Sequence, residues 1–312
     1  MSRPTKIWIA LGTVYVIWGS TYLGIELAGE TMPPLFAAGT RFLAAGLLMA
    51  GFTVVRRGRR ALRIERRQLA SCILVGALLP GANALLFISE RHVPTGLASL
   101  IIGSVPLWIV VLRTASGDHP PRAALAGVVG GFCGLALLVR PHGGAPLWAL
   151  LLVVASAVTW AVGAFLSGKL PMPDDTFAAT AYEMLAGGVI LLPIALATTN
   201  PHPSDFSARS ILGWVYLVTF GSLIGYTAFT WLLDNAPIGR VATYAYVNPV
   251  VAIALGAIVL HESITWTIVL GAAIVLACVA VVVRRESIPP EAEAVGAGAA
   301  AEAHTAAGAP PS

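Results

Sequence analysis

Ten apolar blocks, most of them near the length of a membrane-spanning helix, divide this chain. Hydrophobic residues make up 57% of the sequence and charged residues 11%, whereas a soluble domain carries about 25% charged residues. A spanning α-helix needs about 20 predominantly apolar residues, and polar–apolar alternation is weak in almost every block. The sequence therefore predicts an all-α polytopic membrane protein with ten transmembrane helices. The blocks cover residues 7–28, 34–55, 69–89, 94–112, 123–140, 147–168, 176–198, 211–233, 239–260 and 264–283.

Residues of the first half of the chain recur in the second half at a nearly constant interval. Trp18 recurs as Trp160, and Arg41 corresponds to Glu183, both at an interval of 142 residues. An interval of 143 relates a Pro–Gly–Pro set in each half, namely Pro94, Gly96 and Pro106 with Pro237, Gly239 and Pro249. The matches indicate an internal duplication, with one five-helix repeat over 7–140 and another over 147–283.

An odd number of spans in each repeat turns the second repeat upside down relative to the first. Such inverted repeats are a recurring construction of secondary transporters, in which the substrate site lies near the bilayer midplane between the repeats. The pattern therefore predicts two inverted five-helix repeats that work by alternating access. The alternative is a static membrane scaffold in which the duplication is only a trace of history.

Lysine and arginine are distributed unequally between the two sides of the predicted bundle. With the N-terminus in the cytoplasm, the cytoplasmic segments hold 15 of these residues and the outer segments hold three, while Arg41 falls within a span. Seven of the 15 are arginines in one cytoplasmic loop over 56–67. The positive-inside bias places both termini in the cytoplasm. It also explains the arginine loop better than nucleic-acid binding does, with anionic lipid headgroups as a lesser alternative.

Several features predict no further site. The tail over 286–312 is rich in Ala, Gly, Pro and Glu, and we expect it to be disordered because it cannot bury enough apolar surface. Cys72, Cys133 and Cys278 lack metal-ligand spacing, which favours packing roles and no metal or other cofactor. No cleaved signal peptide is evident, so the first block stays as a helix. Overlapping GxxxG patterns over 127–134 predict close helix packing, within the chain or in a homodimer.

Both halves resemble a known transporter family. The segments IWGSTYLGI, GTRFLAAGL, VPTGLASLI, EMLAGGVIL and YAYVNPVVA are similar to those of the EamA transporters of the drug/metabolite transporter superfamily, and in particular to YedA-like bacterial exporters. The resemblance covers about residues 7–283. It implies a ten-helix carrier of the bacterial inner membrane, most simply an exporter of a small metabolite, amino acid or drug.

Three ionisable residues fall within the predicted spans, where a charge costs at least about 2.5–3.5 kcal/mol near the bilayer centre. Arg41 lies about seven residues into span two from the outer face, roughly 10 Å at 1.5 Å per residue. Glu183 lies about as far into span seven from the inner face, and Glu26 is near the outer end of span one. We expect Glu26 to pair with Arg41. Glu183 stands apart as a carboxyl that takes up and releases the proton of a proton-coupled exporter. A structural or snorkelling role is the alternative for Arg41.

Polar and aromatic residues of the spans predict the wall of a central cavity. Tyr244, Tyr246 and Asn248 lie in span nine, where Tyr244 and Asn248 are four residues apart and share a helix face. Pro249 and its counterpart Pro106 each remove a backbone donor, which predicts helix hinges at equivalent places in the two halves; bending that only fits the bundle is the alternative. We add Trp18, Asn83, Trp160 and Tyr226 as further substrate-contacting residues. His261 and Glu262 are expected in an outer loop, as a turn or an outer gate.

These features favour a secondary carrier over the other functional classes. No GxxxxGK[ST] loop for nucleotide binding occurs in the chain. The few histidines lie in loops, in the tail or at span edges, which argues against a membrane hydrolase. No polar stripe or filter loop of a channel stands out. A lipid scramblase or flippase-like protein without gradient coupling stays open as the alternative. The expected partners are a small-molecule substrate and the lipid bilayer.

Overall fold

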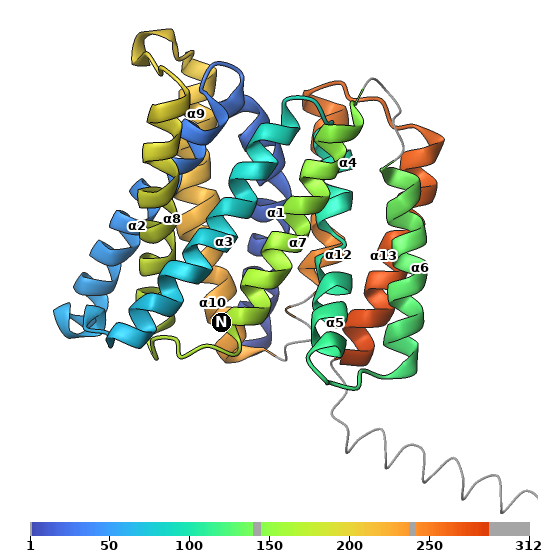
Figure 1. Ribbon diagram of the computed structural model, residues 1–312, viewed down its shortest axis with the longest axis horizontal. Coiled ribbons are helices and arrows are strands. Elements are labelled where there is room, and N and C mark those ends of the chain that lie inside the picture. The colour runs from blue at the N-terminus through green and yellow to red at the C-terminus, as the bar shows by residue number, and fades with distance from the viewer. Residues whose placement is uncertain (1, 140–144, 237–240, 242, 287–312) are drawn as a thin grey trace, which may run out of the picture.

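A computed structural model describes residues 2–139, 145–236, 241 and 243–286, and every regular element in these ranges is helical (Figure 1). The first half of the chain forms long helices that follow one another with short connections. Its elements are α1 (Arg3–Gly29), α2 (Pro34–Arg57), the short 3₁₀-helix η1 (Arg59–Leu62), α3 (Arg66–Glu90), α4 (Thr95–Ile102), α5 (Val105–Ala115) and α6 (Arg122–Leu138).

The second half repeats this plan with local differences. Its elements are α7 (Leu147–Ser167), α8 (Thr176–Thr198), the 3₁₀-helix η2 (Pro203–Asp205), α9 (Ala208–Tyr216), the π-helical segment η3 (Leu217–Ile224), α10 (Gly225–Asn235), α12 (Tyr244–Val259) and α13 (Trp266–Glu286). The predicted tail beyond Glu286 lies outside the described residues, as do Pro237 and Gly239 of the sequence repeat. Glu286 itself closes α13, so this helix extends into the first residue of the predicted tail.

Eight helical stretches are long and apolar enough to cross a membrane, and two of the remaining described helices, α6 and α12, are shorter and apolar. Together they fall on the ten blocks that the sequence predicts. Pairs of elements fill two of the blocks, because α4 and α5 form one stretch over Thr95–Ala115 and α9 continues through η3 into α10. The chain is therefore a multi-pass helical membrane protein.

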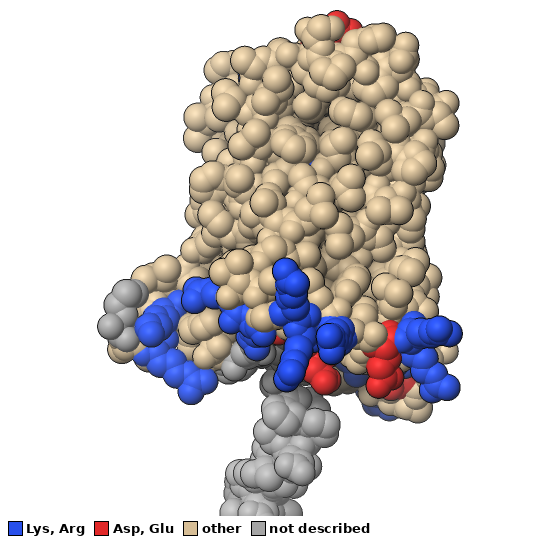
Figure 2. All heavy atoms as spheres, turned by 90° about the vertical axis from the view of Figure 1, so that its left-hand side faces the viewer, with Lys and Arg blue, Asp and Glu red and all other residues tan. Residues whose placement is uncertain are grey.

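The connection between α2 and α3 marks one end of the bundle, which we call the basic end. Lysine and arginine side chains gather there (Figure 2), and the exposed arginines at 56, 57, 59, 60, 63, 66 and 67 all belong to this connection or its edges. Gly58 ends α2 with φ of 81°, a left-handed conformation that glycine adopts without strain. The connection is tied to the second half, because Arg57 pairs with Asp175 at 3.3 Å and the Tyr182 hydroxyl donates to the Leu62 carbonyl at 2.7 Å.

Helices of one half pack mainly against helices of the other half. The most extensive contacts join α2 with α8, α6 with α13, and α3 with α7 and α8; α1 packs on α9, α10 and α12. In Figure 1, α2 lies at one edge of the bundle, and α6 and α13 lie side by side at the other. Equivalent spans of the two halves lie five places apart along the chain. When each span is replaced by its equivalent, the contact of α3 with α7 becomes the contact of α9 and α10 with α1, and both contacts are present.

Small residues let α2 and α8 approach closely and in a reciprocal manner. A Cβ atom on Gly46 would lie 2.8 Å from the backbone nitrogen of Leu185, and one on Gly188 would lie 2.5 Å from that of Leu43. Gly46 and Gly188 occupy equivalent places in the two repeats, 142 residues apart, and so do Leu43 and Leu185. Contact of i with j and of j with i is what a twofold axis produces. Since the residue numbers rise on one helix as they fall on the other, the two equivalent helices run antiparallel.

Candidate substrate cavity

A cavity of about 370 Å³ lies between the helices of the two halves. Its wall includes residues of α1, α2, α3, α4 and α5 from the first half and of α7, η3, α10, α12 and α13 from the second. This volume lies near the lower limit of the roughly 300–1,000 Å³ that ligand pockets in proteins usually have. Nine of the residues that sequence reasoning selected are on the wall: Trp18, Arg41, Asn83, Pro106, Trp160, Tyr226, Tyr244, Asn248 and Pro249.

An aromatic cluster around Trp18 forms one side of the cavity. The Trp18 ring lies edge-on to Tyr226 at 5.5 Å and to Tyr244 at 5.2 Å between ring centroids, and its centroid is 4.9 Å from that of Phe229. The indole N–H donates to the Gly221 carbonyl oxygen at 3.2 Å, so α1 is fixed to η3 at this point. Aromatic pairs of this geometry contribute to stability beyond their buried area, and Trp18, Tyr226 and Tyr244 line the cavity with largely apolar rings.

Span nine contributes to the wall through one helix face. Tyr244 and Asn248 line the cavity, whereas Tyr246 does not. Tyr246 was expected to contact substrate, but a residue two positions along an α-helix points to another side, and it packs against the hydrophobic core instead. The hydrogen-bond network assigns the Asn248 amide nitrogen to the side that faces the carbonyl oxygens of Tyr15 and Tyr244, and in this orientation it donates to both at 3.3 Å. This amide therefore links α12 to α1 beside the cavity.

Two further hydrogen bonds lie near the cavity wall, one within α3 and one between α7 and α3. The Asn83 amide donates to the Leu79 carbonyl oxygen at 3.3 Å within α3. The buried Ser156 hydroxyl of α7 donates to the Ala82 carbonyl oxygen at 2.7 Å, which joins the two halves. Trp160 lies one helical turn further along α7, on the same face as Ser156.

Arg41 is buried on the cavity wall with its guanidinium only partly hydrogen-bonded. Its side chain is 5% exposed, and Nε donates to the Ser222 hydroxyl at 3.3 Å. Nη2 lies beside Gly221, where a Cβ atom would be 3.3 Å away. Nη1 has no hydrogen-bond partner in the described part of the chain. The π-helical turn of η3 carries both Gly221 and Ser222, and π-turns are frequent at functional sites.

The other two charged residues of the predicted site lie away from the wall. No ion pair joins Glu26 to Arg41 within 4.0 Å among the described residues, so the expected contact between them is not formed here. Glu26 is half-buried near the end of α1. Glu183 is half-buried on α8, where α3 passes so close that a Cβ on Gly76 would lie 2.3 Å from the Glu183 carbonyl oxygen. Electrostatically, Tyr226 interacts with both Arg41 and Glu183.

The two prolines differ in their local structure. Helix α4 ends at Ile102, and α5 begins at Val105, with Pro106 as the second residue of α5. Proline is tolerated there because its missing N–H would lack a helical partner anyway. Pro249 lies inside α12, which continues through it. Among the described residues, the interruption between α4 and α5 therefore has no equivalent at Pro249.

At the end of the bundle opposite the basic end, α4 contacts both α12 and Glu262. Helix α4 packs against α12, and a Cβ on Gly96 would lie 3.0 Å from Ile253 Cγ1. The Glu262 carboxylate accepts hydrogen bonds from the backbone N–H groups of Thr95 at 2.7 Å and Gly96 at 3.1 Å. A carboxylate at a helix N-terminus satisfies free donors and complements the helix dipole. His261, the only non-glycine residue with positive φ in the described ranges, makes the preceding turn.

Sequence reasoning missed Glu90, the last residue of α3. Its side chain is 3% exposed, and neither carboxylate oxygen has a hydrogen-bond partner among the described residues. It interacts electrostatically with Glu26, Glu262 and Arg41. The predicted span ended at residue 89, so Glu90 was counted with the loop. The sequence signal for its burial was the short length of the polar segment Ser89–His92, which has apolar residues directly before and after it.

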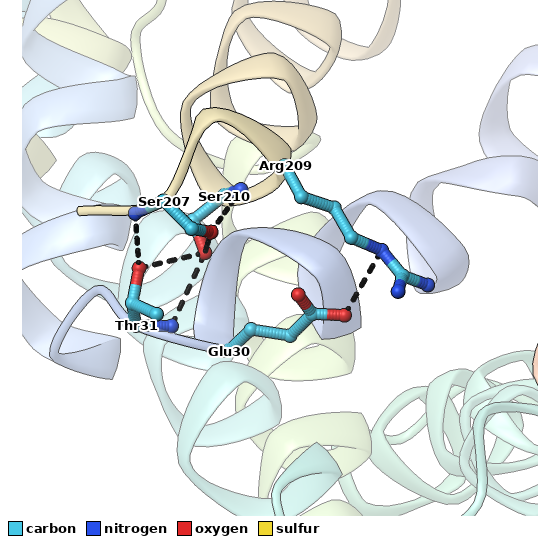
Figure 3. A network of polar contacts seen from close by, with 5 residues as sticks. All are labelled: Glu30, Thr31, Ser207, Arg209 and Ser210. Atoms are coloured by element: carbon cyan, nitrogen blue, oxygen red, sulfur yellow. Dashed lines mark hydrogen bonds and ion pairs between the residues drawn. The ribbon is translucent and has the colours of Figure 1, made fainter.

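A polar network ties the α1–α2 connection to the start of α9 at this same end (Figure 3). The buried Ser210 hydroxyl accepts from the Thr31 N–H at 3.1 Å and from the Thr31 hydroxyl at 2.9 Å, while the Thr31 hydroxyl accepts from the Ser207 N–H at 2.9 Å. Glu30 pairs with Arg209 at 3.1 Å. At the basic end, the repeat-equivalent connection makes a simpler contact, in which the Gln68 amide donates to the Met172 carbonyl oxygen at 3.3 Å.

Comparisons with known proteins agree with this architecture. The family model described as "EamA-like transporter family" matches residues 6–140 and 147–284. The chain is 34% identical over 253 residues to the protein named "Uncharacterized inner membrane transporter YedA" of Escherichia coli strain K12, covering 79% of this chain and 80% of that protein. It is 26% identical over 300 residues to "Uncharacterized transporter YvbV" of Bacillus subtilis strain 168, covering 94% of this chain and 96% of that protein.

A solved structure described as "Crystal structure of protein" shares the fold. The TM-score is 0.63 at 20% sequence identity, and the match covers 90% of this chain and 98% of the other. At this identity the likeness concerns the fold alone. The family model spans both halves of the chain and leaves out only the short segment between them and the two ends. Together with the multi-pass helical bundle and its central cavity, these matches establish that the chain is a membrane transporter of the EamA-like transporter family.

Proposed function

We propose that this protein is a secondary active exporter of a small, partly apolar metabolite, amino acid or drug, and that it works by alternating access. The observation that carries the proposal is the cavity, because its wall is shared between the two halves. A site at the junction of two repeats can be exposed to either side when one half rocks against the other. The reciprocal contacts of Gly46 and Gly188 support an inverted arrangement of the repeats.

The proposal includes ten membrane spans with both termini in the cytoplasm of a bacterial cell, in the inner membrane. The gathering of lysine and arginine at the basic end supports this orientation (Figure 2), because positive residues are retained on the cytoplasmic side. The basic end is then cytoplasmic, and the end at which α4 contacts α12 and Glu262 faces outward. We further propose that export is coupled to proton entry, with Glu183 as the carboxyl that binds the proton.

Uptake into inverted membrane vesicles tests the function. The vesicles come from cells that lack their own related exporters, and a panel of metabolites and drugs is offered on the outside, which corresponds to the cytoplasm. We expect saturable accumulation of at least one compound that requires the pH gradient and stops when an uncoupler removes it. A fluorescent lipid assay in reconstituted vesicles runs in parallel. Energy-independent lipid equilibration without accumulation of any compound would instead identify a scramblase.

A further inference from the structure

Arg41 is a buried cation on the cavity wall without a counter-ion in contact. Its side chain is 5% exposed, and no carboxylate lies within 4.0 Å of it among the described residues. Nη1 lacks any hydrogen-bond partner in the described part of the chain. Burying a guanidinium without a negatively charged partner is unfavourable. A negatively charged group that enters the cavity would therefore stabilise Arg41 by pairing with it.

The protein holds this guanidinium at Nε, whereas Nη1 is buried without a hydrogen-bond partner among the described residues. Nε donates to Ser222 at 3.3 Å, Nη2 lies against Gly221, and the central carbon sits 5.0 Å from the centroid of the Phe42 ring. Ser222 is itself fully buried. These contacts hold the side chain in one orientation, and a planar guanidinium held in this way is suited to an oxyanion.

Internal carboxylates do not take this place. Glu90 interacts with Arg41 electrostatically, but it lies beyond ion-pair distance and is not part of the cavity wall. Glu26 and Glu183 are also absent from the wall. Among the described wall residues, Arg41 is the one Lys or Arg. A single guanidinium balances a monoanion such as a carboxylate, whereas the dianion of a phosphate monoester would leave one charge uncompensated in a largely apolar site.

We propose that the cavity binds a small organic carboxylate, whose oxygens pair with Arg41 and whose apolar or aromatic body packs against Trp18, Tyr226 and Tyr244. The proposal rests on the proposed function, because it names the substrate class of the same cavity. The aromatic rings lie on the same wall as Arg41, since Trp18 donates to Gly221, which also borders the Arg41 guanidinium. A ligand can therefore contact the charge and the rings at the same time.

Binding of three matched probes tests this inference. Phenylacetate, phenylacetamide and phenethylamine share one aromatic body and differ in charge, and their binding to the purified full-length protein is measured by isothermal titration calorimetry in detergent. We expect phenylacetate to bind about tenfold or more tightly than phenylacetamide, since a hydrogen bond to a charged group contributes about 1.5–3 kcal/mol. Equal binding of these two probes, or no phenylacetate binding up to its solubility limit, would overturn the proposal.

Variants assign the preference to Arg41. Arg41→Gln should bind phenylacetate and phenylacetamide equally, and Arg41→Lys should restore part of the preference. Arg209→Gln, which removes an arginine that pairs with Glu30 outside the cavity, should keep it in full. Glu90→Gln, which changes a buried carboxyl outside the cavity wall, should also keep it. A preference that persists in Arg41→Gln, or one lost in Arg209→Gln with normal thermal unfolding, would contradict the assignment.

The outcome is separable from that of the proposed function. Suppose that a neutral or cationic compound accumulates in response to the gradient and that the three probes bind equally well. This result would refute the carboxylate site and support the exporter function. Arg41-dependent binding of phenylacetate, without accumulation of any compound in the vesicle assay, would support the carboxylate site and refute the exporter function.

Discussion

At the residue scale, the charged groups inside the bundle differ in how the protein holds them. Arg41 is anchored at Nε by Ser222, and its buried Nη1 has no hydrogen-bond partner among the described residues. Glu262 uses both carboxylate oxygens on backbone N–H groups of α4. Glu90 has no hydrogen-bond partner in the described part of the chain. The fully satisfied Glu262 fits a structural role, whereas unsatisfied buried groups at cavity edges are candidates for ligand or proton binding.

Replacing Glu183 tests the proposed proton coupling. Glu183→Gln should lose accumulation driven by the pH gradient, because an amide cannot bind the proton, and should still exchange substrate when no gradient is present. The measurement compares gradient-driven uptake with exchange in the same vesicles, using the compound identified from the panel. Asp174→Asn is the matched control, since it removes an exposed carboxylate next to the start of α8. Undiminished gradient-driven uptake in Glu183→Gln would refute the assignment.

Several residues that sequence reasoning selected line the cavity, but their hydrogen-bond partners could not be predicted from the sequence. This reasoning selected Trp18, Asn83 and Tyr226 because each has a polar or aromatic counterpart at the matched place of the other repeat, and Tyr244 because it shares a helix face with Asn248. It could not foresee that Arg41 contacts Ser222, since this contact depends on the π-turn in η3. Hydropathy carries no signal for such a turn. Glu90 escaped because an error of one residue in a helix boundary decides whether a carboxyl is buried or in a loop.

At the level of single elements, small residues determine how closely the spans approach. The contact of α2 with α8 depends on glycines at which any side chain would meet the backbone of the partner helix. The sequence showed these glycines as part of the EamA-like segments, but it did not show which helix they face. A hinge at Pro106 stays a prediction: the break between α4 and α5 falls at residues 103–104, and Pro106 lies in the first turn of α5.

Gly188→Ala tests the α2–α8 contact. The added methyl would lie 2.5 Å from the Leu43 backbone nitrogen, which must move the helices apart, and overpacking of this kind costs about 1–3 kcal/mol. We expect a lower thermal unfolding midpoint in detergent. Gly51→Ala on α2 is the control, because a Cβ there meets nothing within 4 Å, and alanine favours the helix by roughly 1 kcal/mol. Equal midpoints for Gly188→Ala and the wild type would show that the helices are not in close contact.

At the scale of the whole molecule, the cavity lies between two halves that contact each other reciprocally. At the end opposite the basic end, α4 packs on α12 and binds Glu262. The duplication accounts for the exchange of contacts between spans five places apart, since each repeat presents the same faces to the other. The sequence did not indicate which spans contact each other, because hydropathy locates spans along the chain and not in space.

Alternating access requires that α4 and α12 separate at this end of the bundle during part of the cycle. Gly96→Cys and Ile253→Cys place two thiols across the α4–α12 contact, since a Cβ on Gly96 lies 3.0 Å from Ile253 Cγ1, close enough for a disulfide to form. Thr21→Cys adds a reporter on the cavity wall. The three native cysteines, of which Cys133 is exposed, are first replaced so that only the introduced thiols react.

The most direct test is labelling of the Thr21→Cys reporter by a membrane-impermeant maleimide applied to each face in turn. Without the α4–α12 disulfide, we predict labelling from both the outer and the cytoplasmic face. Once the disulfide is formed, labelling from the outer face should stop, labelling from the cytoplasmic face should continue, and a reductant should restore both. Outer labelling that is unaffected by the disulfide, or that never occurs in the reduced protein, would contradict alternating access through this cavity.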